Sequence, residues 1–360
     1  MKADEFAKII ADALKEAKEE RGKINVLIAG RTGVGKSTLI NSIFQGEMAK
    51  TGQGEPVTKT TLKITKEGIP LAIWDTRGLE MAAFEETIEE LERVVVDQAK
   101  HTDYFEHIHV AWICIHEDGR RVEDAEVKLH EMLAAHMPVI GVITKARSDQ
   151  GFRVEVQRLL PKAKNVVRVR ALKEELDEGT ILQPMGLEDL AKLTSEVIPV
   201  AIKRAFAAAQ TADLQQKKDE AAQIVTIAVT AAGAAAATPI PFSDAIALVP
   251  IQVGMLAKIS SVFGLNTSED SLKTIVAIIA GTAGATLIGR AIVSNLLKFI
   301  PGGGSLLGGA ISAATAISIT AALGNIYIET LAYLFEKSQG EVPANEDIER
   351  EIKRRFEIKA

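Results

Sequence analysis

Two hydrophobic patterns alternate along the first part of the chain. Short apolar, β-prone runs predict buried strands, and apolar positions with helical spacing predict helices between them. The predicted strands span 24–29, 62–66, 70–75, 107–115, 138–144 and 165–170. The predicted helices lie near 35–45, 84–100, 121–136, 152–160 and 186–205. This order predicts an α/β domain with a mostly parallel six-stranded sheet, helices on both faces and a ligand site at the carboxyl ends of the strands.

The pattern changes after residue 220, where charged residues become scarce. Residues 221–328 hold only seven charged residues in 108 positions, whereas about a third of the other positions are charged. Small apolar residues dominate, and prolines separate the helical patterns. The predicted helices lie at about 216–237, 244–263, 271–298 and 305–336. The sequence therefore predicts a second, all-α domain of apolar helical hairpins.

Two further segments flank these domains. The N-terminal segment has an amphipathic helical pattern, with Phe6, Ile9, Ile10 and Ala13 on one face. The C-terminal segment is charged, with Ile348, Ile352 and Phe356 on one helical face. We therefore expect four parts: a helix at 1–22, the α/β domain at 23–208, the apolar helical domain at 209–336 and a charged helical tail at 337–360.

Composition narrows the class of protein. The net charge is −6 and no basic block stands out, so we expect no nucleic-acid partner. Cys114 is the only cysteine and lies in an apolar run, which excludes an internal disulfide and fits a buried residue in a reducing cytosol. The first residues lack the apolar core of a secretory signal. The six histidines show no metal-ligand spacing.

The segment 30–37, Gly-Arg-Thr-Gly-Val-Gly-Lys-Ser, matches the G-x-x-x-x-G-K-[ST] pattern of a phosphate-binding loop. It follows a predicted strand and opens a predicted helix, as such a loop requires. Its glycines let successive N–H groups and the helix N-terminus face a phosphate. We expect Lys36 to reach the β- and γ-phosphates and the Ser37 hydroxyl to bind Mg²⁺.

Residues further along the chain complete the predicted phosphate site. Asp75 and Gly78 end the third strand in the D-x-x-G pattern of small GTPases, where the aspartate orients the Mg²⁺ shell and the glycine N–H senses the γ-phosphate. Thr58 precedes the second strand and is our candidate for the threonine that completes the Mg²⁺ site. Thr60 and Thr61 are rivals that the sequence leaves open.

On these motifs and on Thr144-Lys145, residues 23–208 resemble the TrmE–Era-like branch of the translation-factor-related GTPases. Gly33 and Val57-Thr58 look more like immunity-related and dynamin-type GTPases. The apolar part is similar to an uncharacterised helical domain attached to GTPases in bacteria. The resemblance implies binding of GTP and GDP with Mg²⁺, hydrolysis of GTP to GDP and phosphate, and action of Lys36, Thr58 and Gly78 on the γ-phosphate.

The base-reading motif departs from this family. It is normally N/T-K-x-D, whose aspartate accepts hydrogen bonds from guanine, but Arg147 stands in the aspartate position here. Asp149 is a possible substitute, and Ala171 marks the second guanine loop. The predicted nucleotide-binding residues are Gly30, Arg31, Thr32, Gly33, Val34, Gly35, Lys36, Ser37, Thr38, Thr144, Lys145, Asp149 and Ala171. GTP is the expected ligand, and a P-loop ATPase is the less favoured alternative.

The catalytic pattern also departs from the family. Leu79 follows Gly78 where Ras-like proteins carry the glutamine that positions water. Gly33 replaces the asparagine of potassium-stimulated relatives. Arg31 and Arg77 are then candidates for charge stabilisation, in the same chain or across a homodimer. We expect slow hydrolysis by the isolated monomer.

The apolar domain allows two interpretations. Most of its charge-free stretches are shorter than the roughly 20 residues that a spanning helix needs, although 305–328 could supply 24. This favours peripheral or hairpin insertion into a membrane over an ordinary multi-span protein. A soluble bundle that binds a protein partner is the alternative. The expected location is the cytoplasm, with conditional association at the inner face of the cell membrane.

Overall fold

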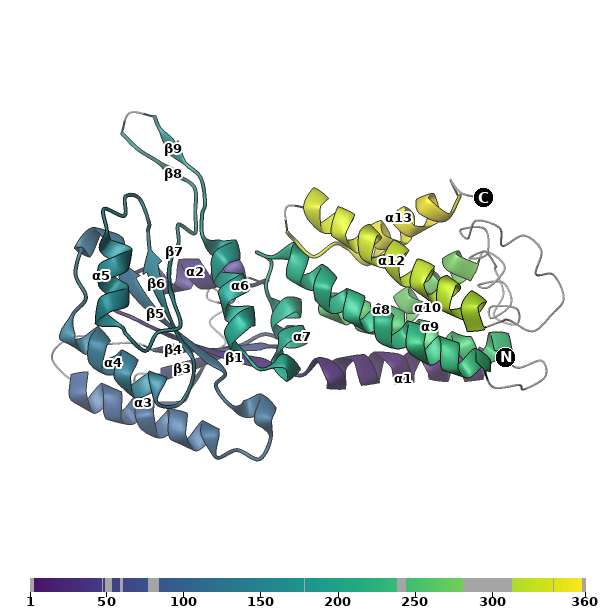
Figure 1. Cartoon of the computed structure of the whole chain (residues 1–360), viewed down its shortest axis with the longest axis horizontal. Helices are drawn as coiled ribbons and strands as arrows, with labels where there is room; N and C mark the ends of the chain where they lie inside the picture. The colour runs from purple at the N-terminus through teal and green to yellow at the C-terminus, as the bar shows by residue number, and fades with distance from the viewer. Residues whose placement is uncertain are drawn as a thin grey trace. The chain divides into compact units, whose positions relative to one another are not determined.

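One mixed sheet forms the centre of the first part of the chain (Figure 1). The strands, in their order across the sheet, are β2 (Gly54–Pro56), β3 (Thr61–Thr65), β4 (Leu71–Thr76), β1 (Ile24–Ala29), β5 (Val110–His116), β6 (Val139–Thr144) and β7 (Val166–Arg168). Strands β4, β1, β5, β6 and β7 run parallel, and β2 and β3 are antiparallel. All six predicted strands are present, and β2 is a short seventh strand that the pattern did not reveal.

The computed structural model divides the chain into two compact units. Residues Gly22–Asp213 form the sheet unit, and Met1–Arg21 together with Leu214–Ala360 form the helical unit. The residues that the structure describes are 3–46, 48, 54–58, 61–76, 84–177, 179–237, 244–280, 313–338 and 340–357.

Among the residues that the structure describes, six helices cover the sheet on its two faces (Figure 1). They are α2 (Lys36–Ile43), α3 (Phe84–Ala99), α4 (Asp124–Ala134), α5 (Phe152–Leu159), α6 (Leu187–Val197) and α7 (Val200–Ala209). Along β1, Val26 and Ile28 join the core beneath α2, α6 and α7, whereas Leu27 joins the core beneath α3, α4 and α5. This alternation follows from the two-residue period of a strand. The result is the predicted three-layer arrangement.

The helix predicted over 186–205 is two helices. Pro199 stands before α7 and Ile198 has an extended backbone. The proline ring disfavours the α conformation of the residue before it, which explains the break. A β8–β9 hairpin (Glu174–Glu175 and Ile181–Leu182) was not predicted either, and it projects from the sheet unit in Figure 1.

The described part of the helical unit is a set of long helices. They are α1 (Ala3–Arg21), α8 (Leu214–Ala237), α9 (Asp244–Val262), α10 (Glu269–Ala280), α12 (Ala313–Lys337) and α13 (Asn345–Glu357). Helix α1 packs along α9, α8 packs along α12, and α10 packs against α13. The predicted helices over 271–298 and 305–336 are described only in part, because 281–312 lie outside the described residues.

Polar contacts join helices that are far apart in the sequence. Lys258 of α9 forms ion pairs with Glu16 (2.9 Å) and Glu20 (2.8 Å) of α1. Lys218 of α8 pairs with Glu329 of α12 at 3.2 Å. The N-terminal amphipathic helix is therefore part of the helical unit, with its buried face against α9.

Candidate functional site

The loop of residues 30–35 joins the end of β1 to the start of α2. Its glycines have positive φ angles, 146° at Gly30, 78° at Gly33 and 101° at Gly35. At Gly30 a Cβ atom would lie 2.5 Å from the carbonyl oxygen of Cys114, so only glycine fits there without a shift of the backbone. Gly35 caps the N-terminus of α2, where free N–H groups favour an anion.

Lys36 closes this loop. Its Nζ donates hydrogen bonds to the carbonyl oxygens of Gly30 (2.7 Å) and Arg31 (3.2 Å). The ammonium group therefore lies against the first two residues of the loop. Ser37 and Thr38, which follow it in the first turn of α2, are exposed.

Two further predicted residues lie near strand ends. Asp75 is buried, at 9% exposure. It pairs with Ile28 in the β1–β4 register, and Ile28 lies two residues before Gly30. The Thr58 Oγ1 accepts a hydrogen bond from the backbone N–H of Thr61 at 3.0 Å, in the turn before β3. Carboxylate and hydroxyl oxygens are the hard donors that Mg²⁺ prefers, so the chemistry of this donor set fits that ion.

Arg31 forms an ion pair although its side chain is 43% exposed. Its Nη1 lies 2.6 Å from Oε1 of Glu123, and Arg121 contacts the same carboxylate oxygen at 2.9 Å. Glu123 in turn precedes α4 and forms a capping box with Glu126. The other predicted residues of this region, Gly78, Arg77 and Thr60, lie outside the described residues.

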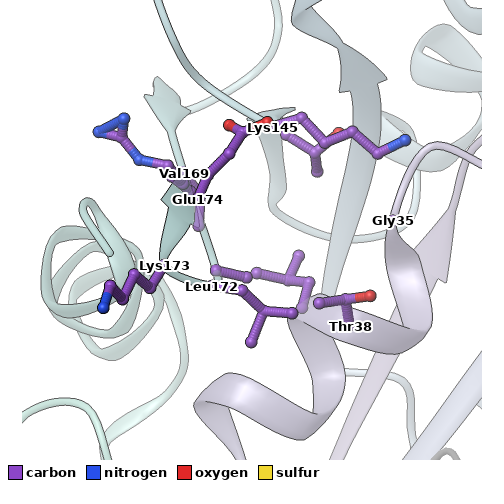
Figure 2. A pocket seen from close by; sticks show the side chains of 11 residues that line it. Gly35, Thr38, Lys145, Val169, Leu172, Lys173 and Glu174 are labelled. Carbon is purple, nitrogen blue, oxygen red and sulfur yellow. The ribbon is translucent and has the colours of Figure 1, made fainter. Parts of the chain in front are cut away.

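A cavity of about 260 Å³ adjoins the loop (Figure 2). Its lining residues are Gly35, Thr38, Leu39, Thr144, Lys145, Val169, Arg170, Ala171, Leu172, Lys173 and Glu174. In Figure 2, Lys145 and Glu174 lie at one side of this cavity and Leu172 and Thr38 at the other. Four of the predicted nucleotide-binding residues thus share one cavity with Gly35 of the loop.

Thr144 and Lys145 connect this cavity to the loop directly. Thr144 Oγ1 contacts the carbonyl oxygens of Val34 (2.5 Å) and Ile115 (3.2 Å). Lys145 has a left-handed backbone with φ of 53°, and its Nζ donates to the Gly33 carbonyl at 3.0 Å. The lysine stem therefore crosses the edge of the loop, where it can cover a flat ring.

Asp149 has a different position from Lys145. Its Oδ1 accepts a hydrogen bond from the backbone N–H of Arg153 at 2.8 Å and lies 3.7 Å from Arg168 Nε. It is not among the residues that line the described cavity. In this structure Asp149 supports the start of α5.

Arg147 instead forms a bidentate ion pair with Glu174. Its Nε donates to Oε2 at 3.0 Å, and its Nη2 donates to Oε1. The ion pair keeps the pKa of the Glu174 carboxyl below its usual range. Sequence reasoning missed Glu174, since it belongs to no motif. An acidic residue shortly after the Ala171 loop was the signal available.

Glu117 fixes the backbone of this region. Its Oε2 accepts hydrogen bonds from the N–H groups of Arg147 (2.5 Å) and Ser148 (2.8 Å), and its Oε1 accepts from Arg168 at 2.7 Å. Burial alone would raise the pKa of Glu117, but these hydrogen bonds keep it below the ordinary value. An ionised Glu117 thus holds residues 147–148 beside β7.

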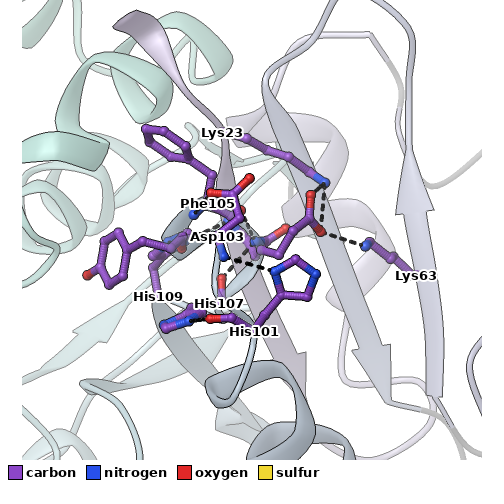
Figure 3. A network of polar contacts seen from close by, with 10 residues as sticks. Lys23, Lys63, His101, Asp103, Phe105, His107 and His109 are labelled. Atoms are coloured by element: carbon purple, nitrogen blue, oxygen red, sulfur yellow. Dashed lines mark hydrogen bonds and ion pairs between the residues drawn. The ribbon is translucent and has the colours of Figure 1, made fainter. Parts of the chain in front are cut away.

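A second polar network lies near the start of β1 (Figure 3). The Nδ1 of His109 accepts from the N–H of Asn25 (3.0 Å), so Nε2 carries the proton and donates to the Tyr104 carbonyl (3.1 Å). Burial lowers the pKa of His109 to about 4. Lys23 and Lys63 both bind Glu106. Within the described residues no group of three His, Cys, Asp or Glu side chains could hold a metal ion.

Two stretches of the chain match known protein families. Residues 25–145 match the family described as 50S ribosome-binding GTPase, and residues 202–357 match the family described as domain of unknown function (DUF697). A probable GTP-binding protein engB of known structure has 20% sequence identity and a TM-score of 0.34, and the alignment covers 48% of this chain and 97% of that one.

Curated relatives share only part of the chain. Magnetosome membrane protein 22 of Magnetospirillum gryphiswaldense is 34% identical over 101 residues, 28% of this chain and 52% of that protein. The tRNA modification GTPase MnmE of Marinomonas sp. is 37% identical over 95 residues, 25% of this chain and 20% of that protein. MnmE of Cupriavidus pinatubonensis is 29% identical over 149 residues, 39% of this chain and 30% of that protein. The chain therefore spans about half or less of the length of these relatives; one stretch of it matches the family described as 50S ribosome-binding GTPase and another stretch matches the family described as domain of unknown function (DUF697).

Proposed function

We propose that this chain is a Mg²⁺-dependent GTPase that hydrolyses GTP to GDP and phosphate and couples its nucleotide state to membrane association of the helical unit. The observation that carries the proposal is the phosphate loop and its adjoining cavity, which share Gly35. A nucleotide with its phosphates on the loop can place its base in that cavity. The family match of residues 25–145 supports GTP as the nucleotide.

The roles of the loop residues follow from their chemistry. Lys36 exchanges its two carbonyl partners for the β- and γ-phosphate oxygens, which compensate the ammonium charge better than carbonyl oxygens do. The hydroxyls of Ser37 and Thr58 and the carboxylate of Asp75 would hold Mg²⁺. When bound, that ion neutralises charge on the phosphates.

Hydrolysis by the isolated chain is proposed to be slow. An arginine directed at the transferring phosphoryl group is worth about 10³–10⁵ in rate, but Arg31 is committed to Glu123 at 2.6 Å. Release of Arg31 from Glu123, for example in a GTP-bound homodimer, would supply the missing positive charge. A turnover number that rises with protein concentration is the expected sign of that step.

The proposed coupling begins at the C-terminal end of α2. Hydrogen bonds join Gln45 N to the Ala209 carbonyl (3.1 Å) and Thr211 N to the Ile43 carbonyl (2.9 Å). The Gln210 side chain also bonds the backbone N–H and carbonyl of Asp213. Residues 209–213 lead directly into α8, so a shift of the phosphate-loop helix can reach the first residue of the helical unit through these bonds.

Membrane association is supported by two helices. Helices α8 and α12 are long and apolar enough to cross a membrane, judged by length and composition alone. Only 33% of the most apolar 18-residue stretch of α8 is buried, and Ile227 within α8 is 61% exposed. One relative is named as a magnetosome membrane protein. We propose that this protein is cytoplasmic and associates conditionally with the inner face of the cell membrane.

Liposome flotation of the full-length protein tests this proposal. The purified chain would be mixed with anionic liposomes in the presence of GDP or a non-hydrolysable GTP analogue. We expect more protein to float in one nucleotide state, and lipid to stimulate GTP hydrolysis. A Lys36→Ala variant, which cannot respond to nucleotide, should show the same flotation in both conditions.

The second candidate is a soluble GTPase switch whose helical unit binds a protein. It is favoured by α12, in which 56% of the most apolar window is already buried inside the unit. Buried polar pairs also join its helices, such as Gln252 Nε2 to Thr320 Oγ1 at 3.3 Å. A monodisperse protein that floats in neither nucleotide state, with hydrolysis insensitive to lipid, would support this candidate.

A further inference from the structure

The cavity next to the phosphate loop contains one acidic side chain. Among its described lining residues, Glu174 is the only carboxylate, whereas Leu39, Val169, Ala171 and Leu172 provide apolar surface. Glu174 belongs to β8 of a hairpin that starts where Arg170 pairs with Met185. A carboxylate beside apolar lining residues can accept hydrogen bonds from the N–H donors of a ligand.

Arg147 restrains this carboxylate. Both guanidinium contacts reach Glu174, one on each carboxylate oxygen. The third guanidinium nitrogen of Arg147, Nη1, lies 3.8 Å from Oδ2 of Asp118. A planar, bidentate pair of this kind fixes the orientation of a carboxylate better than a single contact does. An ionised carboxylate has about four acceptor positions, so each Glu174 oxygen keeps acceptor capacity for a ligand.

The purine bases differ at the edge that such a carboxylate would meet. Guanine presents the N1–H and the 2-amino group, two donors pointing in one direction. Hypoxanthine lacks the 2-amino group, and adenine has an unprotonated N1 that a carboxylate repels. A fixed, ionised Glu174 therefore favours guanine over both.

We propose that Glu174 reads the N1–H and 2-amino edge of guanine, and that Arg147 positions Glu174 for this contact. The inference rests on the proposed binding of GTP. It assigns specificity to a residue of the β8–β9 hairpin, and it gives Arg147 a role in place of the carboxylate expected at its position.

The test measures dissociation constants of GDP, IDP and ADP by calorimetry with the full-length chain. We expect wild type to bind GDP about 10- to 100-fold more tightly than IDP, as for a hydrogen bond to a charged group, and ADP more weakly still. In Glu174→Ala the ratio of the IDP and GDP dissociation constants should fall to about one. Glu175→Ala is the matched control, because the neighbouring side chain is exposed and does not line the cavity.

Arg147→Ala tests the positioning role. We expect a ratio between those of wild type and Glu174→Ala, while Arg158→Ala, which removes an exposed ion pair on α5, keeps the wild-type ratio. A general folding defect would weaken GDP and IDP equally. A wild-type ratio in Glu174→Ala, with GDP still preferred, overturns this inference and leaves the proposed GTPase function intact. A wild-type chain that binds no guanine nucleotide, or binds ADP equally well, overturns both.

Discussion

The sheet unit and the helical unit both have apolar interiors with buried aromatic rings, such as Phe263 and Phe335 in the helical unit, but they bring their backbones together differently. In the sheet unit, Phe44 stacks on Trp112 at 5.6 Å and meets Phe206 edge-on at 6.3 Å. In the helical unit, small residues such as Ala232 and Ala316 lie in the core, and Gly324 brings α12 close to α8. Large rings fill space between elements, whereas small residues let helix backbones approach closely.

The two units also differ in how polar groups are buried. In the helical unit, hydroxyls and amides bond across helices, for example Tyr327 to Ser260 at 2.7 Å. In the sheet unit, buried polar groups such as Asn25 and His109 mainly bond backbone atoms of loops. The comparison indicates that the stability of the sheet unit depends on its loops and strand ends. The stability of the helical unit depends instead on single close contacts between helices.

The positions of the aromatic residues let the units be followed separately. Both tryptophans, Trp74 and Trp112, are buried in the sheet unit. Tryptophan fluorescence therefore reports unfolding of the sheet unit alone, whereas far-ultraviolet circular dichroism is dominated by the long helices. Each variant below should change the signal of the unit in which it lies.

The largest effect is expected from Gly30→Ala in the sheet unit. Its backbone has a φ angle of 146° and the new Cβ would lie 2.5 Å from the Cys114 carbonyl oxygen. We expect a loss of about 3 kcal/mol in the free energy of unfolding reported by tryptophan fluorescence. We also expect loss of measurable GDP binding, since the phosphate loop must shift. Gly119→Ala, where nothing lies within 4 Å, is the control and should bind GDP normally.

Acid should destabilise the sheet unit through His109. Burial lowers its pKa from 6.5 to about 4 in the folded chain. Between these two pH values the unfolded chain binds more protons than the folded chain, so stability falls as the pH falls through this window. The shift corresponds to at most about 3 kcal/mol. Burial also lowers the pKa of His130, so protonation of this residue further lowers the stability of the folded chain as the pH falls.

Urea unfolding followed by tryptophan fluorescence at pH 7, 6, 5 and 4.5 measures this dependence. His109→Gln replaces the ring with a group that can accept from Asn25 and donate to Tyr104 but does not titrate. The variant should lose less stability than wild type over the same pH range. Equal slopes for the two proteins would show that His109 does not control the acid sensitivity.

The sequence predicts locally encoded features well. The strands, the helices around them and the phosphate loop each follow from a continuous run of residues. The break before Pro199 was missed, although a proline there disfavours a continuous helix by a local rule. The roles assigned to Ser37, Thr58 and Asp75 stay predictions.

Features that join distant residues could not be predicted. Helical periodicity shows that α1 has an apolar face, but not that Lys258 of α9 would pair with Glu16 and Glu20. The Arg147–Glu174 pair likewise joins the loop after β6 to strand β8, which no shared motif connects. The departure at Arg147 was visible in the sequence, but the structure was needed to find its partner.

A moderate effect is expected from Gly324→Val in the helical unit. A Cβ at Gly324 would lie 2.5 Å from Cγ2 of Val225 and 3.0 Å from the sulfur of Met255. We expect a loss of about 2 kcal/mol as α8 and α12 separate, seen by circular dichroism with tryptophan fluorescence unchanged. Gly254→Ala is the control: nothing lies within 4 Å of that position in α9, so it should add about 0.5–1 kcal/mol through helix propensity. Equal destabilisation by both variants would mean that close packing at Gly324 does not determine the stability of the helical unit.

The smallest effect, Tyr327→Phe, tests whether single polar contacts between helices matter. Ser260 donates its hydroxyl proton to the Leu256 carbonyl at 2.8 Å, so the buried Tyr327 hydroxyl donates to Ser260 Oγ at 2.7 Å. Phenylalanine keeps the ring and leaves Ser260 its bond to Leu256, which limits the expected loss to about 1 kcal/mol. Tyr333→Phe, at a ring that is 40% exposed, should change stability by less than about 0.5 kcal/mol. If both variants are neutral, apolar packing holds the helical unit, and the contrast between the two units in their buried polar contacts has no consequence for stability.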